Sequence, residues 1–443
     1  MNFEYFFARR ITFQTQRAVS GLVVRLSIIS IALAVATMEI SLSFVQGFET
    51  EISNKVVGFG SHVLVTHYTE SSYNKVEVKP ISLYDTLVID RGGQFEYRID
   101  TVVNDLQKLE NVKGVSPYIH KAGLLQSSDY YEAVLLKGVQ AEYQWDFLEG
   151  SLLEGSIPDF HGDTVSREIL ISNRIARKLD LQVGDKGRFV FFPMPIKRRP
   201  VRIAGIFETG MEEFDNSFVI CDIRTLRGIW GWEDDQISGI EVNLENIDTG
   251  DQWYWNFSSF PFLHQDTLTA LDYANIDIAR SSPPEYKARP ITWIFPEIFD
   301  WLDMQHQNVW VILILMMVVA IINMTSVILI LVIERTYTVG ILKAMGLANH
   351  RIQRMFVFNA FFLILIGVLA GNLLGLGLLA SQDLFGWLKV NQDTYFIETV
   401  PVAWVWVRFI LVNIGVTLIC GLAMFLPTII INHISPVKAI RFE

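Results

Sequence analysis

The chain has 443 residues, of which 51% are hydrophobic and 19% are charged, and its formal net charge at pH 7 is −11. This negative charge argues against a nucleic-acid partner, because the phosphate backbone attracts cationic surfaces. We predict that the two cysteines, Cys221 and Cys420, lie too far apart to form a disulfide. The fold is therefore expected to depend on its apolar core.

Four apolar stretches are long enough to cross a bilayer, since a spanning helix needs about 20 mostly apolar residues. One lies near the N-terminus, and the other three follow in close succession after an interval of about 260 residues. The predicted spans cover residues 26–45, 308–333, 356–379 and 402–431. The first is interpreted as an uncleaved span and not a signal peptide, because its apolar run continues through Val45.

The Lys and Arg residues beside these spans predict their orientation. Residues 1–25, 334–355 and 432–443 carry clusters of cations, whereas the loop 380–401 carries only Lys389 among acidic residues. Because cytoplasmic loops are enriched in Lys and Arg, both ends of the chain and the middle loop are expected in the cytoplasm. Residues 1–25 are expected to include a short amphipathic helix on the inner surface.

Residues 46–307 are expected to form a large outer domain of mixed α and β structure, with two subdomains. Alternating and helical patterns predict its elements. Strands are expected at 60–67, 133–139, 168–172, 188–192, 201–207 and 218–221, and helices at 100–109 and 173–179. Residues 68–97 show little apolar periodicity and are interpreted as an inserted loop or hairpin.

The loop 193–200 between two of these strands contains three prolines, which are expected to keep it from extending the sheet. Two interpretations of this loop stay open: an ordinary solvated hairpin tip, or a docking finger for an acidic partner. The candidate docking residues are Pro195, Lys197, Arg198 and Arg199.

Enzymatic motifs are missing from the sequence. It contains no Gly-x-x-x-x-Gly-Lys-Ser/Thr phosphate loop, no His-Glu-x-x-His, no Cys or His cluster with zinc spacing and no Gly-x-Ser-x-Gly elbow. We therefore assign no catalytic residue and no metal ligand, and we predict that the chain does not hydrolyse ATP itself.

Several polar or small residues fall inside the predicted spans. Glu39 lies fourteen residues after Arg25, about 21 Å along a helix, which places it in the outer half of the bilayer. It either faces a protein cavity or reaches the outer headgroups through tilting of the span. Asn323 is interpreted as an interhelical hydrogen-bond partner, with a transport role as the minority alternative. The spacing of Gly367, Gly371 and Gly375 predicts close packing of helices.

The cytoplasmic loop contains the most informative local motif, Glu334-Arg-Thr-Tyr-Thr-Val-Gly-Ile-Leu-Lys-Ala-Met-Gly346. Its pattern predicts a short amphipathic helix ending at Gly346. The apolar side of this helix carries Val339, Ile341, Leu342 and Met345. Such a ridge suits a groove on a soluble partner, although the same pattern also fits a simple juxtamembrane helix.

This motif resembles the coupling helix of FtsX-like ABC permeases of the MacB/LolC/LolE superfamily, as does the terminal Ser435-Pro-Val-Lys-Ala-Ile-Arg441. Four further pieces resemble the lipoprotein-releasing LolC/LolE family most closely. They are Phe7-Ala-Arg-Arg, Ser27-Ile-Ile-Ser-Ile-Ala-Leu-Ala, Gly47-Phe-Glu and Phe295-Pro-Glu-Ile-Phe-Asp-Trp-Leu. One departure is Thr338, where the family pattern usually has an acidic residue.

The resemblance implies an α-helical membrane protein with four transmembrane helices and a large α+β, MacB-like periplasmic domain between helices one and two. It also implies that two permease subunits, identical or sister chains, pair with two cytoplasmic ABC ATPase subunits, which bind the ATP and Mg²⁺. The residues expected to contact the ATPase are Glu334, Arg335, Val339, Gly340, Ile341, Leu342, Lys343, Ala344, Met345 and Gly346.

The resemblance further implies a lipoprotein as substrate, entering from the outer leaflet and passing to a periplasmic carrier. Glu39, Phe44, Phe48 and Asn323 are the candidate residues of the acyl-chain cavity, and the loop 193–200 occupies the place of a carrier-binding loop. We therefore interpret the chain as the permease subunit of a lipoprotein-releasing ABC mechanotransmitter in a bacterial inner membrane. Three alternatives are an exporter of a drug, toxin or lipid, a cell-division signalling permease that controls a cell-wall hydrolase and, with poorer support, a membrane-bound enzyme.

Overall fold

The computed structural model describes residues 18–67, 81–82, 84–91, 94–109, 111–192, 196–245, 270–283 and 286–428. The predicted N-terminal amphipathic helix, the terminal motif 435–441 and Pro195 lie outside the described residues. The chain divides into two compact units. The helical unit comprises residues 1–48, 302–389 and 399–443, and the sheet unit comprises residues 49–301 and 390–398.

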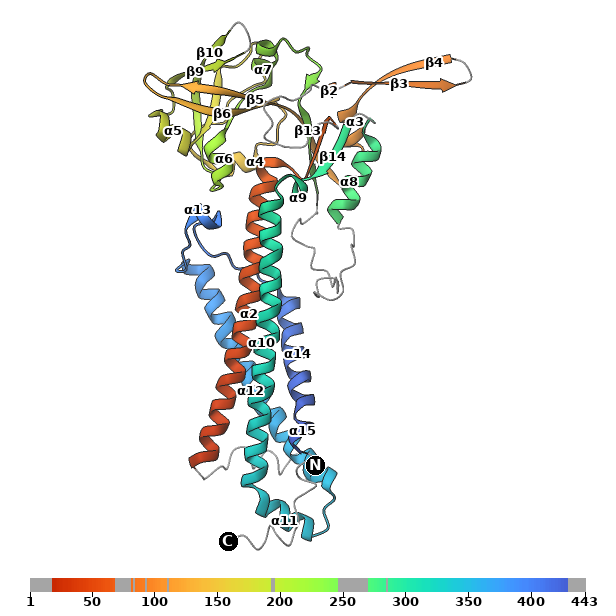
Figure 1. Ribbon diagram of the computed structural model, residues 1–443, viewed down its shortest axis with the longest axis vertical. Coiled ribbons are helices and arrows are strands. Elements are labelled where there is room, and N and C mark those ends of the chain that lie inside the picture. The colour runs from red at the N-terminus through yellow and green to blue at the C-terminus, as the bar shows by residue number, and fades with distance from the viewer. Residues whose placement is uncertain are drawn as a thin grey trace. The chain divides into compact units, whose positions relative to one another are not determined.

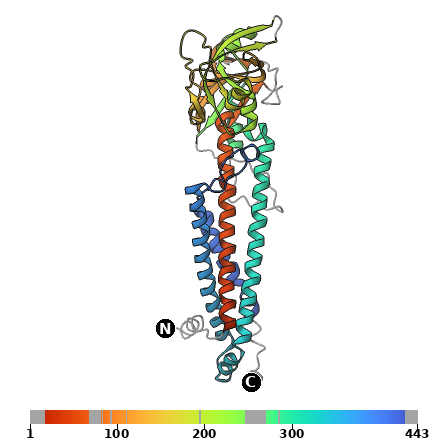
Figure 2. The same cartoon turned by 90° about the vertical axis from the view of Figure 1, so that its left-hand side faces the viewer.

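The helical unit contains four helices that are long and apolar enough to cross a membrane (Figures 1 and 2). Its helices are α2 (Ala18–Gly60), α10 (Pro296–Glu334), α11 (Thr336–Ala344), α12 (Asn349–Phe385), α14 (Trp406–Ala423) and α15 (Phe425–Thr428). The first and second have 43 and 39 residues, about 65 and 58 Å, roughly twice the apolar thickness of a bilayer. Both therefore extend well beyond the predicted spans 26–45 and 308–333.

The fourth predicted span, 402–431, is interrupted in the structure. Helix α14 ends at Ala423, and α15 begins at Phe425. Pro427 lies in the first turn of α15, where the missing N–H of proline costs no intrahelical hydrogen bond. The described part of this segment is therefore two helices, α14 and the short α15, and not one continuous helix.

A ten-stranded sheet forms the body of the sheet unit. Its strand order is β14 (Tyr286–Pro290), β1 (Val63–His67), β13 (Gly239–Leu244), β5 (Val112–Gln126), β6 (Tyr131–Val139), β11 (Phe218–Asp222), β8 (Glu168–Ser172), β10 (Lys197–Phe207) and β7 (Leu152–Gly155). The tenth strand, β9 (Lys186–Phe191), pairs with both β10 and β5.

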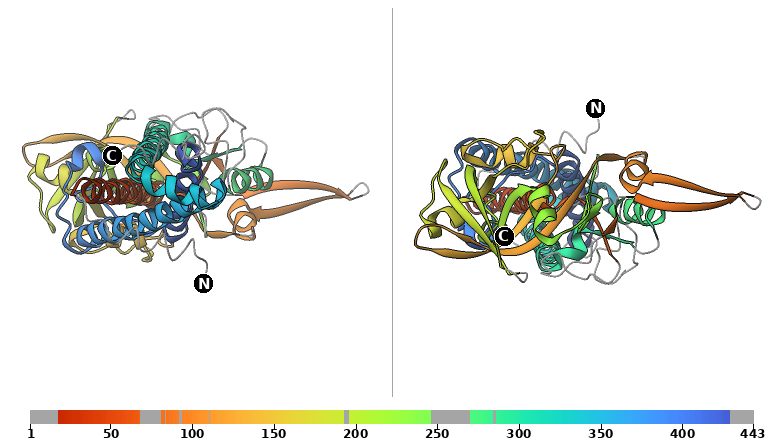
Figure 3. Two further views of the ribbon diagram at one scale, coloured as in Figure 1. Left: turned by 90° about the horizontal axis from the view of Figure 1, so that it is seen from below. Right: turned by 90° about the horizontal axis from the view of Figure 1, so that it is seen from above.

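This double pairing of β9 closes part of the sheet into a barrel. Among the strands that the structure describes, the ring runs β5, β6, β11, β8, β10, β9 and back to β5. The right-hand view of Figure 3 looks onto the sheet unit from above. Its interior is filled by alternate residues of these strands, including Leu136, Ile171, Phe189, Ile203 and Val219. Closure removes the exposed edges that an open sheet would present.

Short helices complete the sheet unit. They are α3 (Val102–Gln107), α4 (Asp146–Gly150), α5 (Asn173–Leu179), α6 (Glu212–Ser217), α7 (Ile223–Trp230), α8 (Ala270–Ser281), α9 (Ile291–Ile294) and α13 (Gln392–Tyr395). Two of them start directly after a strand with a side-chain cap. Ser172 accepts a hydrogen bond from the Ile175 N–H at 3.1 Å, and Asp222 accepts one from the Arg224 N–H at 2.9 Å.

The inserted region 68–97 is described only in part. Strands β3 (Tyr84–Arg91) and β4 (Gln94–Thr101) form a separate antiparallel ribbon, seen at the right of Figure 1. A further short pair joins β2 (Ile81–Ser82) to β12 (Gln236–Ile237). The described part of the insert is therefore a hairpin, which was one of the two predicted possibilities.

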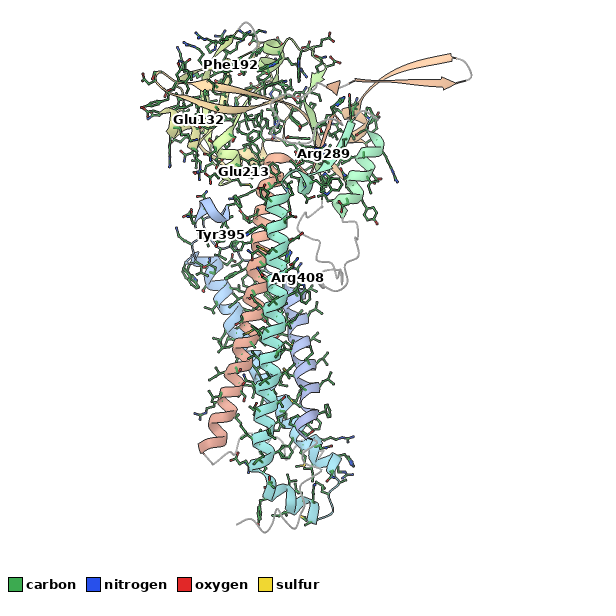
Figure 4. All side chains as sticks on the ribbon, viewed as in Figure 1. Glu132, Phe192, Glu213, Arg289, Tyr395 and Arg408 are labelled. Carbon is green, nitrogen blue, oxygen red and sulfur yellow. The ribbon has the colours of Figure 1, made fainter. Side chains whose placement is uncertain are left out.

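The predicted loop 380–401 is divided between the two units. Residues 390–398 belong to the sheet unit and include α13, and Figure 4 labels Tyr395 there. The Lys55 ammonium of α2 donates a hydrogen bond to the Phe396 carbonyl at 3.0 Å. The rings of Trp301 and Tyr395 lie 6.4 Å apart. The middle of this loop is therefore part of the sheet unit and not a free connection between two spans.

Candidate functional site

Helix α11 carries most of the residues predicted to contact an ATPase. Gly346, two residues after the helix, has a positive φ of 86°, a backbone conformation that favours glycine and ends a helix. The Leu347 N–H then donates to the Leu342 carbonyl at 3.0 Å. The predicted helix and its glycine terminator are thus present, with Glu334 as the last residue of α10 and Arg335 between the two helices.

The apolar residues of α11 face two directions. Val339 is buried in the core of the helical unit, and Leu342 packs against that core. Tyr337, Ile341 and Met345 are exposed, and Met345 shows 79% of its surface to solvent. Because these three residues are four apart, they form one ridge. The outward ridge therefore includes Tyr337, which sequence reasoning missed, and lacks Val339.

A small, mostly apolar cleft lies between α11 and the start of α12. It is lined by Arg335, Thr338 and Val339 on one side and by Ile352 and Asn359 among others on the opposite side. Lys343 lies near the end of α11, and partial burial lowers the pKa of its ammonium. Helix α11 is thus anchored to the helical unit on one side and exposed along the ridge of Tyr337, Ile341 and Met345.

Glu39 of α2 lies in a polar contact with two asparagines. Its side chain is 0% exposed, and its Oε1 accepts a hydrogen bond from Asn413 of α14 at 3.2 Å. Asn413 and Asn372 of α12 exchange two hydrogen bonds of 2.7 and 3.0 Å. Asn323 of α10 likewise donates to the Ser30 hydroxyl of α2. Both predicted cavity residues are therefore directed at neighbouring helices of this chain.

The three glycines of α12 lie against α2. A Cβ at Gly367 would stand 2.8 Å from the Ile31 Cβ, and a Cβ at Gly371 would stand 2.8 Å from the Ala32 carbonyl oxygen. At Gly375 the Glu39 Oε2 would be 2.5 Å away. No larger residue fits at these distances, so the glycine face allows α2 and α12 to approach closely.

The assignment of Glu39, Phe44 and Phe48 to an acyl-chain cavity stays a prediction, but Glu39 lies on a different side of α2 from the two phenylalanines. At 100° per residue, Phe44 lies about 140° and Phe48 about 180° from Glu39 around the helix. Phe44 and Phe48 are half-buried and lie on the other side of α2. That side continues through exposed apolar residues, namely Leu33, Ile29 and Leu26. The apolar surface of α2 therefore excludes Glu39.

The part of α2 around residues 43–47 is held by the residues just before α14 and by the first turn of α14. Ser43 Oγ donates to the Ala403 carbonyl at 2.9 Å, and the Arg408 guanidinium, labelled in Figure 4, donates to the Gln46 side chain. Gly47 meets the Pro401 carbonyl, where a Cβ would approach within 2.5 Å. The Gly47-Phe-Glu motif thus has a packing reason for its glycine.

The cations of the predicted docking loop belong to a strand. Strand β10 begins at Lys197, whose ammonium donates to the Ile229 carbonyl. Pro200 is tolerated there because pairing with β8 starts only at Arg202, so its missing N–H leaves no ladder hydrogen bond unmade. Pro200 therefore does not prevent pairing with β9, contrary to the sequence-based expectation.

Arg198 belongs to a larger basic face on β9 and β10. In the register, Arg202 is opposite Lys186 and Pro200 is opposite Arg188, so these side chains and Arg198 share one face. These four cations, here called the basic strip, are Lys186, Arg188, Arg198 and Arg202. All four are exposed, and none has an ion-pair partner in the part of the chain that the structure describes. Arg199 lies on the opposite face.

Sequence reasoning missed three members of the basic strip. Lys186 and Arg188 alternate along β9, and Arg198 and Arg202 are an even number of residues apart on β10. This period-2 signal was readable, but strand pairing was needed to bring the two pairs together. Two exposed apolar residues, Ile196 and Phe192, adjoin the strip, and Phe192 is labelled in Figure 4.

Two family models match the chain. One is described as the MacB-like periplasmic core domain and matches residues 25–253. The other is described as the FtsX-like permease C-terminal and matches residues 310–436. The first covers more than half of the chain, and the second covers three of the four candidate membrane helices.

Curated relatives align over most of the chain. The lipoprotein-releasing system transmembrane protein LolE of Haemophilus influenzae is 22% identical over 440 residues, covering 95% of this chain and 94% of that protein. LolC of Neisseria meningitidis serogroup B is 24% identical over 395 residues, with 85% and 83% covered. LolC of Xylella fastidiosa is 20% identical over 435 residues, with 94% and 93% covered.

Two solved structures are also similar to the chain. The periplasmic region of MacB from Actinobacillus actinomycetemcomitans has a TM-score of 0.33 and 12% identity, covering 54% of this chain and 94% of that one. The extracellular domain of the noncanonic ABC-type transporter YknZ from Gram-positive bacteria has a TM-score of 0.29 and 16% identity, covering 42% and 87%.

Proposed function

The chain belongs to the family of FtsX-like permeases with a MacB-like periplasmic core domain, and from that premise we propose that it releases lipoproteins from a bacterial inner membrane. The observation that carries this proposal is the alignment of relatives named for the lipoprotein-releasing system over nearly the whole chain. In this proposal both chain ends are cytoplasmic and residues 46–307 are periplasmic.

The energy for release comes from a separate ABC ATPase dimer, which binds ATP and Mg²⁺. The exposed ridge of Tyr337, Ile341 and Met345 on α11 supports this contact, because an apolar helical ridge suits a groove on a soluble partner. The inner side of α11 packs against the core of the helical unit. A push on the ridge would therefore be passed into α12 and α10, and not absorbed by a loose loop.

The acyl chains of the cargo are proposed to meet α2 and α10. Phe44 and Phe48, with the exposed Leu33, give α2 one continuous apolar side, and α10 exposes a similar series that includes Val311, Ile314 and Leu315. A second permease subunit, identical or sister, would enclose the cargo between such surfaces. Glu39 and Asn323 then hold the helices of one subunit together, and they line no cargo surface.

The basic strip is proposed to bind a periplasmic carrier with an acidic surface. Its four cations carry no internal counter-charge among the described residues, and the whole chain has a net charge of −11. Local positive charge on an acidic protein favours a complementary partner, because opposite potentials steer association. The exposed Phe192 and Ile196 would add apolar contact beside the charges.

The proposal is tested by replacing the chain in living cells with variants and fractionating labelled lipoproteins between the two membranes. Phe44→Asn is expected to reduce release about tenfold, because an amide in an apolar path costs about 1–3 kcal/mol. Leu373→Asn is the matched control, since Leu373 is 78% exposed but lies on α12. Both variants are expected to co-purify with the ATPase as the natural chain does.

Two results would count against lipoprotein release. Normal lipoprotein sorting after depletion of the natural chain, with no paralogue to compensate, would contradict the proposed activity. It would favour an exporter or a signalling permease. Equal defects in the Phe44 and Leu373 variants would remove the assignment of the α2 surface to the cargo.

A further inference from the structure

A fully buried lysine lies at the end of α2 within the sheet unit. Lys137 is on β6 and has a side-chain exposure of 0%, although lysine is rarely buried unless it is paired. The interior of the barrel takes Val134 and Leu136 of the same strand, so Lys137 points to the other face of the sheet. Phe59, in the last turn of α2, is also completely buried there.

The Lys137 ammonium forms one ion pair, with Glu241, and two hydrogen bonds, to Tyr143 and Phe59. The Nζ lies 2.6 Å from Oε1 of Glu241 on β13, 3.1 Å from the Tyr143 hydroxyl and 2.8 Å from the Phe59 carbonyl oxygen. The carbonyls of the last helical turn have no intrahelical N–H to accept from. The ammonium therefore satisfies one of them and also places its positive charge at the negative end of the helix dipole.

The charge of Lys137 is retained at neutral pH. Burial by itself lowers the pKa of the ammonium, but the Glu241 carboxylate and the Tyr143 hydroxyl outweigh burial, so the pKa stands above its usual value. Burial also raises the pKa of Tyr143, which keeps its hydroxyl protonated. The rings of Phe59 and Tyr143 lie 4.9 and 5.1 Å from Nζ and add cation–π contacts.

Stability alone does not explain such a pair. Taking both charges out of water is costly, and replacing a buried ion pair by apolar residues of similar volume is often neutral or stabilising. The ion pair and its hydrogen bonds are directional contacts. Through Lys137 they join the Phe59 carbonyl of α2 and Glu241 of β13 to β6. Apolar packing fits shapes together, but the hydrophobic effect has no direction, so it does not by itself join one particular atom of α2 to one particular strand.

Aromatic contacts connect Phe59 at the end of α2 to Phe295, the residue before α10. The Phe59 ring stacks on Phe214 of α6 at 4.4 Å, and Phe214 meets Phe295, the residue before α10, edge-on at 5.4 Å. Phe218 of β11 closes the group at 5.0 Å from Phe59. Phe59 at the end of α2 and Phe295 before α10 thus belong to one aromatic cluster, and the Lys137 ammonium adds a charged contact to the α2 end.

We propose that Lys137 is a positioning residue that fastens the end of α2 to β6 and β13, so that a displacement of α2 moves the sheet unit without slippage. The inference rests on the proposed function only in assuming that an ATPase displaces α2. The anchor itself is a property of the sheet unit and can be measured without any cargo.

The first test is hydrogen exchange of the full chain in lipid nanodiscs. The variant is Lys137→Met with Glu241→Leu, which removes both charges together and leaves no unpaired one. Amide exchange in residues 55–60 is expected to rise about tenfold, since the end of α2 loses its anchor. The control is Lys178→Met with Glu132→Leu, which removes an ion pair of the same 2.6 Å length between α5 and the same strand, β6.

The control pair is partly exposed, with side-chain exposures of 47% for Lys178 and 26% for Glu132, and it joins β6 to α5, not to α2 (Figure 4 labels Glu132). It is expected to leave exchange in residues 55–60 unchanged. An unchanged rate in the Lys137 variant as well would overturn the anchor. A rise spread evenly over the whole sheet unit would also overturn it, because that would indicate general destabilisation.

The second test measures coupling in the complex with its ATPase. The Lys137 variant is expected to hydrolyse ATP at the natural rate but to release about tenfold less lipoprotein per ATP, whereas the control pair leaves this ratio unchanged. Release at the natural ratio despite raised exchange would overturn the role of the anchor in transmission. If the natural chain itself releases no lipoprotein, the proposed function is wrong. The hydrogen-exchange result still shows whether Lys137 anchors the end of α2.

Discussion

Two buried carboxylates, one in each unit, meet different partners. Glu241 of the sheet unit is 1% exposed and lies against a lysine ammonium, whereas Glu39 of the helical unit is 0% exposed and accepts one hydrogen bond from an asparagine. The Oε2 of Glu39 has no hydrogen-bond partner among the described residues. Charge pairing fixes one location in the sheet unit, while close packing against glycines does most of the positioning in the helical unit.

The difference follows from what each region must join. At Glu241, strands and a helix end of unlike geometry meet, so a directional contact defines their arrangement. At Glu39, two helices pack side by side along a glycine face, and shape alone sets their distance. A membrane helix also gains little from the hydrophobic effect against its neighbours, so van der Waals contact has to supply the specificity.

Neutralising each carboxylate in turn tests this comparison most strongly. Glu241→Gln should destabilise the sheet unit by about 3–5 kcal/mol, because it leaves the Lys137 charge buried without a counter-ion. Glu39→Gln should cost about 1 kcal/mol or less, since an amide can still accept from Asn413. Denaturant unfolding of the purified chains measures both values. Similar costs at the two positions would show that the two carboxylates have the same role.

Adding a methyl group to the glycine face should have the next largest effect. Gly371→Ala should destabilise the helical unit by about 1–3 kcal/mol, because the new Cβ would stand 2.8 Å from the Ala32 carbonyl oxygen and 2.8 Å from the Val35 Cβ. Gly377→Ala is the control on the same helix, where a Cβ meets nothing within 4 Å. That change should stabilise α12 by about 0.5–1 kcal/mol. Equal effects at both positions, measured by thermal unfolding in detergent, would contradict the packing role.

The smallest expected effect concerns a third carboxylate, Glu213, which lies near the like charge of Glu297. Partial burial and then the nearby Glu297 carboxylate raise the pKa of Glu213, which is labelled in Figure 4. A raised folded-state pKa favours folding when the group is protonated, and that advantage is lost as the pH rises through the folded-state value. At pH 7 the ionised Glu213 therefore opposes folding slightly.

Glu213→Gln should accordingly raise stability at pH 7 by a few tenths of a kcal/mol, a small value because the exposed side chain is screened by solvent. The gain should disappear as the pH falls below the ordinary glutamate value of about 4.5, where the natural residue is also neutral. Unfolding curves at pH 7 and pH 4 measure the difference. A gain that grows toward low pH would have the wrong sign.

Sequence patterns determined the parts of this protein that depend on neighbouring residues. Four apolar runs predicted four helices long enough to span a membrane, the glycine at 346 predicted the end of the short helix α11, and alternation located most strands of the sheet within a few residues. These features follow from periods of 3.6 and 2 residues and from local backbone preferences, which a single chain displays directly.

Tertiary structure alone decided which distant residues meet. The closure of six strands into a barrel, the partner of the glycine face and the joining of Arg202 to Lys186 all depend on pairings between separate segments. Glu39 looked like a cavity residue because depth can be counted along a helix, but the direction of its side chain depends on the neighbouring helices. Lys137 gave no signal in the sequence, because a buried lysine is recognised only by the Glu241, Tyr143 and Phe59 atoms that the fold brings to it.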